Sequence, residues 1–174
     1  MNDLIKGTGR LKVEKYKVPL LLRKNEDKLI YQIEQGIIDP DDIIVSPPND
    51  WFTSGWNLIL SLITGQSSAF YSNSKAQIGV GNSDDAFDDG DSTLQGTESK
   101  FKGMMSEYPD TPASGQVNFR SKFTTSEANF QWEEWGIRGT TGNLLWNRGL
   151  TGGGGSWLKT STKAWAVTAT MGKS

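Results

Sequence analysis

The chain has 174 residues, of which 35% are hydrophobic and 22% charged, and its net charge is −2. This length allows one domain with a core and an extension, while the balanced charge disfavours both a disordered chain and a nucleic-acid-binding protein. Cys and His are both absent, which excludes disulfides, thiolate chemistry, the Ser-His-Asp arrangement and the common zinc sites.

These absences leave carboxylates, Lys and Tyr as the only candidates for catalysis. We therefore expect a protein that is not an enzyme and has no cofactor or bound metal. The longest apolar run, from Trp56 to Ile63, is much shorter than the roughly 18 residues that span a membrane. Residues 1–9 lack the apolar region of a signal peptide, so we expect a soluble protein that is neither exported nor bound to a membrane.

The first part of the chain is rich in basic residues, with eight Lys and Arg before position 30. Two interpretations are open: an arm that lies on an acidic partner surface, or a solvated face of a strand and a helix. In the first, residues 1–50 form an N-terminal anchoring arm and residues 51–174 the folded domain. The expected partner contacts are then Arg10, Lys12, Lys15, Lys17, Arg23, Lys24 and Trp51.

Two short helices are predicted. In the first, Asn25 is the N-cap and Gly36 follows the C-terminal end. Residues 39–49 contain several prolines and are expected to connect, not to form core. The second helix runs over residues 54–63 and ends before Gly65; its apolar residues at helical spacing predict burial, and they are Trp56, Leu60 and Ile63.

From residue 76 the hydrophobic period changes to two. Residues 117–123 give the clearest strand, with Phe119 and Phe123 inward and Arg120 and Lys122 outward. The expected core includes Val117, Phe119, Phe123, Phe130 and Trp132, and further strands are predicted over 76–80, 100–106, 129–137, 144–148 and 163–171. The fold class is thus mainly β, an antiparallel sandwich or small barrel with an N-terminal arm and one or two short helices.

The pattern slips by one residue between Trp132 and Trp135, which predicts a β-bulge near Glu133 and Glu134. A tight hairpin is predicted at residues 141–143. The adjacent carboxylates invite comparison with glycosidases, whose two carboxyls lie about 5 to 9.5 Å apart across a cleft. Neighbours on a strand point to opposite faces, so we expect no catalytic role for them.

Residues 82–91 include five Asp, which could offer oxygen ligands to calcium. The spacing does not match an EF-hand, because Phe87 and Gly96 would take ligand positions; a solvated turn is the preferred alternative. The glycine run 152–155 has no following Lys-Ser/Thr and predicts a flexible turn. The chain also has seven Trp, which suit a sugar-stacking surface, a protein interface or a core; for Trp132 and Trp56 we expect core.

The β region holds an ordered series of short motifs: Ile78-Gly79-Val80-Gly81-Asn82, Ala86-Phe87, Thr93-Leu94-Gln95-Gly96, Tyr108-Pro109, Val117-Asn118-Phe119, residues 126–137 and Leu145-Trp146-Asn147-Arg148. This series, over residues 55–174, resembles a family of small structural proteins of tailed phages. A looser resemblance, to the N-terminal domain of phage tail-collar fibre proteins, rests on Ile78 to Gly81, Thr93-Leu94, Glu134, Gly136, Ile137 and Gly142-Asn143-Leu144.

The resemblance implies a virion component that is assembled in the host cytoplasm. We also expect the chain to be homo-oligomeric in the assembled particle. Its partners would be phage capsid or tail proteins, with no nucleic acid and no membrane. A sandwich with a basic arm favours a capsid decoration or cement protein that binds the head shell. A tail, baseplate or fibre-attachment protein is the first alternative, and a carbohydrate-binding module the second.

Overall fold

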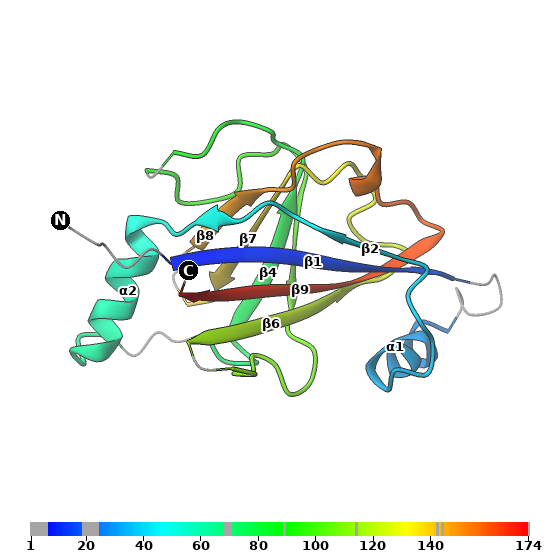
Figure 1. Ribbon diagram of the computed structural model, residues 1–174, viewed down its shortest axis with the longest axis horizontal. Coiled ribbons are helices and arrows are strands. Elements are labelled where there is room, and N and C mark those ends of the chain that lie inside the picture. Colours follow the sequence, from blue (N-terminus) through cyan, green and yellow to red (C-terminus); the bar gives the residue numbers. More distant parts are fainter. Residues whose placement is uncertain are drawn as a thin grey trace.

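The computed structural model describes residues 7–18, 25–67, 71–88, 90–113, 115–141, 143 and 145–173. These residues form two antiparallel sheets that pack face to face as a β-sandwich, with one helix at each end (Figure 1). The sheets do not join into a barrel. The predicted fold class, a mainly β antiparallel sandwich with short helices, is confirmed.

Sheet A has five strands. Its order is β2 (Asp42–Val45), β1 (Gly7–Lys17), β9 (Lys163–Lys173) and β6 (Gln116–Phe123), and β3 (Asn49–Asp50) also pairs with β1. The pair of β1 and β9 is the longest: it runs without interruption from Gly7 opposite Lys173 to Lys17 opposite Lys163. The start and the end of the described chain therefore lie side by side (Figure 1).

Sheet B has four strands in the order β5 (Ser99–Gly103), β4 (Ala76–Gly81), β7 (Glu134–Gly139) and β8 (Leu145–Leu150). The short 3-10 helix η1 (Gly155–Trp157) follows β8. Glycines at the centre of this sheet let other groups approach closely. A Cβ on Gly79 would meet the Phe101 ring at 2.2 Å, and one on Gly136 would meet the Asn147 carbonyl oxygen at 2.4 Å.

The core lies between the sheets and consists of the inward-facing residues that alternate along their strands. From the predicted set, Phe119, Phe123 and Trp132 are buried, and Val117 and Phe130 pack against them half-buried. Trp132 contacts Phe123 and Trp165 edge-on, with ring centroids 4.9 and 4.6 Å apart. The single aromatic core predicted for this region is confirmed.

Both predicted helices form. Helix α1 (Glu26–Glu34) begins after Asn25, whose side-chain oxygen accepts from the Lys28 N–H at 3.1 Å, and Gly36 follows it with φ 61°. Leu29 and Ile33 of α1 pack on the outer face of sheet A. Helix α2 (Thr53–Ile63) lies at the opposite end of the sandwich (Figure 1).

The division into an arm of residues 1–50 and a domain of residues 51–174 is wrong for the described residues. Residues 7–17 form β1, an inner strand of sheet A, and its Leu11 and Val13 are fully buried in the core. Two lysines hid the period-two pattern: Lys12 lies between Leu11 and Val13 and points to the other face of the strand, while Lys15 has the inward parity but carries a charge. Residues 42–45, expected only to connect, pair with β1 as β2.

The predicted bulge near Glu133 is also wrong. The strand predicted over residues 129–137 begins only at Glu134, and the register irregularity lies between Ile137 and Arg138. Trp132 belongs to the segment before β7, so Trp132 and Trp135 both reach the core without a bulge between them. The hairpin predicted at residues 141–143 includes position 142, which lies outside the described residues.

Candidate functional site

The outer face of sheet A, which points away from sheet B, combines charged and small residues. Lys12, Glu14 and Tyr16 alternate on β1 with the buried Leu11 and Val13. The residues opposite them on β9 are small, namely Thr168, Ala166 and Ala164. Side chains from β1 and β6 can therefore meet across β9.

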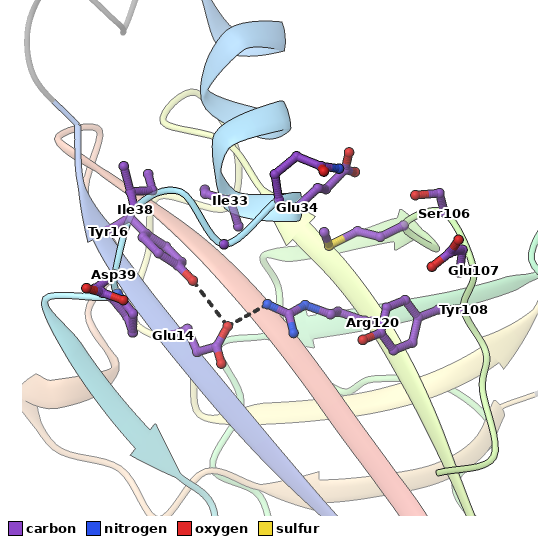
Figure 2. A pocket seen from close by; sticks show the side chains of 14 residues that line it. Glu14, Tyr16, Ile33, Glu34, Ile38, Asp39, Ser106, Glu107, Tyr108 and Arg120 are labelled. Carbon is purple, nitrogen blue, oxygen red and sulfur yellow. Dashed lines mark hydrogen bonds and ion pairs between the residues drawn. The ribbon is translucent and has the colours of Figure 1, made fainter.

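A groove of about 420 Å³ lies on this face, between the segment that ends α1 and the turn at residues 105–108 (Figure 2). Glu14 and Arg120 point toward each other at its floor, while Glu34, Asp39 and Glu107 stand at its rim (Figure 2). Its apolar wall includes Ile33, Ile38 and Met105. We call it the outer groove.

Glu14 is the centre of the hydrogen-bond network at the floor. Its Oε2 accepts from Arg120 Nη2 at 2.6 Å and from the Tyr16 hydroxyl at 3.2 Å, and its Oε1 accepts from Lys12 Nζ at 2.8 Å. The side chains of Glu14 and Arg120 are 12% and 21% exposed. The Arg120 Nε atom is buried and has no hydrogen-bond partner among the described residues.

The network fixes the protonation of its members. Burial tends to raise the pKa of Glu14, but the hydrogen bond from Lys12 and the charges of Arg120 and Lys12 outweigh it and hold that pKa below its ordinary value. Burial, followed by the nearby charge of Glu14, raises the pKa of Tyr16 to about 12. At neutral pH Glu14 is thus an anion and Tyr16 a neutral phenol, so neither is suited to exchange protons there.

The rim has a different character. Glu34, Asp39 and Glu107 are exposed, and none of the three forms an ion pair among the described residues. With Glu14, four carboxylates line the groove, and two cations stand against them: Arg120, and Lys12 bound to Glu14. The excess negative charge beside an apolar wall suits a cationic side chain with an aliphatic stem, such as Lys or Arg.

Four of the predicted partner contacts lie on β1, but they differ in exposure and in the groups that they contact. Arg10, Lys12 and Lys17 are exposed, and Lys12 pairs with Glu14. Lys15 is only 5% exposed: its Nζ donates to Asp42 at 2.8 Å and to the Ser156 carbonyl at 2.6 Å, and it lies over the Trp165 ring. Lys15 is therefore used inside the fold, contrary to the expectation of a surface contact.

Of the other predicted contacts, Arg23 and Lys24 lie outside the described residues. Trp51 is half-buried, bridges to Asn147 of β8, and packs against Trp56 and Trp146 with centroids 4.5 and 5.0 Å away.

The tryptophans do not form an exposed sugar-stacking surface. Five of the seven are buried, namely Trp132, Trp135, Trp146, Trp157 and Trp165, while Trp51 and Trp56 are half-buried. The core position expected for Trp132 is confirmed. For Trp56 that expectation is wrong: its side chain is half-buried and packs against Trp51 outside the core.

Glu134 is completely buried, whereas Glu133 is half-buried. Glu134 accepts from Arg148 Nε at 2.5 Å and from the backbone N–H groups of Gln95 and Gly96 at 3.0 and 2.7 Å. Arg148 in turn donates to the Asp85 carbonyl at 3.0 Å. This ion pair fastens the loop between β4 and β5 to sheet B.

That loop contains the acidic run that could suggest calcium. In the described part of the run, Asp85 accepts from the Ser83 hydroxyl, Asp88 from the Gly90 N–H, and Asp91 from Arg148. No group of three carboxylates that could hold a metal ion occurs among the described residues. The side chains are instead used in local turns and in the contact with Arg148.

Comparisons with protein-family models, with curated proteins and with solved structures find no match to this chain. No helix among the described residues is long and apolar enough to cross a membrane.

Sequence reasoning missed the outer groove, although part of its signal was present. Lys12, Glu14 and Tyr16 are spaced by two and would share a face on any strand. Arg120 was correctly placed on the face of β6 that points away from the core. What could not be foreseen was that β9 would lie between β1 and β6 and bring Glu14 and Arg120 together.

Proposed function

We propose that this chain is a non-enzymatic structural protein of a tailed-phage particle. In this proposal it docks on a neighbouring particle protein, which places a Lys or Arg side chain in the outer groove. The observation that carries the docking step is the rim of Glu34, Asp39 and Glu107, three exposed carboxylates without an ion pair among the described residues. The phage setting is supported by the resemblance over residues 55–174.

The electrostatics of the floor favour binding over catalysis. A general acid or base works best when its pKa lies near the working pH. The pKa values of Glu14 and Tyr16 are instead displaced in opposite directions, below and above their ordinary values. Glu14 is already bound by Arg120 and Lys12, so the attraction for a further cation comes from the rim carboxylates.

An extended basic arm would favour decoration of the head shell. Residues 7–17 are instead part of sheet A, so they do not distinguish a head protein from a tail protein. We therefore propose a particle protein of either region, attached through a preformed groove and not through a segment that becomes ordered on docking.

The first test is the composition of purified particles of the phage that encodes the chain. We expect mass spectrometry to find it in particles freed of lysate proteins, in many copies per particle. A chain that occurs only in the soluble lysate would contradict the particle role.

The second test concerns the groove. The variant Glu34→Lys/Glu107→Lys reverses two rim charges, and Asp84→Lys/Asp88→Lys is the matched control in the exposed acidic loop. One exposed ion pair contributes about 0 to 1 kcal/mol, so the change should appear as lower occupancy on many-copy particles and as a weaker dependence on salt. Equal occupancy for both variants would exclude the groove as the docking site.

A further inference from the structure

Helix α2 has an exposed apolar stripe, although its apolar spacing predicted burial. Its inner side contacts the body through Gly55, Leu58 and Ile59: a Cβ on Gly55 would lie 2.3 Å from the Trp146 carbonyl oxygen, Leu58 is 9% exposed, and Ile59 packs on the core. On the other side Leu60 is 56% and Ile63 76% exposed. The helix thus buries one stripe and leaves a second in solvent.

The exposed stripe has the geometry of a helix-pairing surface. Trp56, Leu60 and Ile63 are spaced i, i+4 and i+7, which places them within about 60° of one another around the axis. Alternating steps of four and three are the spacing by which two helices interlock side by side. Trp56 is held in place by Trp51, whose ring centroid is 4.5 Å away.

The charge around the stripe indicates its partner. Residues 51–74 contain no Asp, Glu, Lys or Arg, although such residues make up 22% of the chain. A partner with charged residues would find no counter-charge on α2 and would have to bury them unpaired. A second copy of α2 brings no such charges, and a twofold interface places the same uncharged surface on both sides.

We propose that α2 pairs with α2 of a second copy of this chain, antiparallel and about a twofold axis near Leu60, the middle residue of the stripe. This interface is separate from the outer groove and does not depend on the proposed docking there. With 11 residues, α2 is about 16 Å long, and one such pair is smaller than the roughly 1,200 Å² of a standard stable interface. The dimer is therefore weak in solution and is favoured where copies are concentrated in an assembly.

Sedimentation equilibrium from about 10 μM to 1 mM tests the pairing, a range chosen to reach affinities weaker than 1 μM. The wild-type mass should rise with concentration from that of one chain toward that of two, and Leu60→Glu/Ile63→Glu should remain monomeric throughout. The matched control is Tyr31→Glu/Ile37→Glu, because both side chains are 58% exposed and lie elsewhere. It should associate like the wild type, and thermal melting of each variant verifies its fold. A wild type that stays monomeric, or a control that dissociates equally, would overturn the proposal.

The twofold axis can be tested by cross-linking, because the chain has no Cys. A single thiol in Leu60→Cys should face its own copy, so mild oxidation should produce a disulfide dimer at least tenfold faster than it does for Ile37→Cys. Equal rates for the two variants would refute the axis and the pairing with it.

Discussion

Two carboxylate–guanidinium pairs of nearly equal length differ in their surroundings. Glu134 and Arg148 join β7 to β8 at 2.5 Å, with 0% and 1% of their side chains exposed. Glu14 and Arg120 meet across β9 at 2.6 Å, with 12% and 21% exposed. The first pair is surrounded by protein, whereas the second forms the floor of an open groove.

The neighbours of each pair explain this difference. Glu134 and Arg148 use backbone groups of one loop, and Gly81 and Gly96 leave room for the carboxylate: a Cβ on either would lie 2.3 or 3.0 Å from Glu134 Oε1. Glu14 is held by side chains alone, and Arg120 Nε has no partner among the described residues. The same kind of ion pair is thus structural in Glu134–Arg148, where backbone groups enclose it. In Glu14–Arg120 it is suited to binding, because one side of the pair is open to the groove.

The most severe change removes one carboxylate together with its strand. Deleting residues 1–17 takes β1 from between β2 and β9 and removes Leu11 and Val13 from the core. Losing two buried aliphatic side chains alone costs several kcal/mol, which is comparable to the whole stability of a domain. We expect circular dichroism and thermal melting to show no cooperative transition. A truncated protein that melts like the intact one would restore the independent arm.

The next prediction compares what the two ion pairs contribute to stability, by one substitution in each. Arg148→Leu leaves Glu134 buried without its counter-charge, which should lower the free energy of unfolding by about 3 to 5 kcal/mol, or Tm by roughly 10 °C. Arg120→Leu leaves Glu14 with Lys12 and some solvent, so the loss should be about 1 kcal/mol. Urea unfolding of both variants measures the contrast. Similar losses would show that burial does not distinguish the pairs.

The parts that could be predicted from the sequence depend on local patterns. Asn25 and Gly36 delimit α1 by capping chemistry, and alternation placed Phe119 and Phe123 in the core. Strand β1 was missed because Lys12, Lys15 and Lys17 made a basic segment look like an arm. On a strand such residues can all be accommodated, two on the surface and Lys15 against Asp42 and Ser156.

The candidate site was less predictable, because it depends on pairing between distant segments. Glu14 and Arg120 are 106 positions apart in the chain, and only the strand order of sheet A makes them neighbours. For the stripe of α2, the sequence predicted the residues but not their exposure. Periodicity identified its apolar residues, but which side of an all-round apolar helix faces the body depends on where Gly55 allows β8 to approach.

The smallest expected effect concerns the pH dependence of the open pair. The folded-state pKa of Glu14 lies below its ordinary value, because Lys12 and Arg120 outweigh the effect of burial. Its contribution to stability is therefore present above the ordinary pKa and is lost as the pH falls through the lowered one. In Glu14→Gln this loss is missing, so stability should fall less steeply between about pH 5 and 3, by at most about 1.4 kcal/mol per pH unit.

Urea unfolding at several pH values measures the slope, and Glu107→Gln is the control, because that rim carboxylate has no hydrogen bond or ion pair among the described residues. Parallel curves for the wild type and Glu14→Gln would show that the network at the floor does not hold the charge of Glu14.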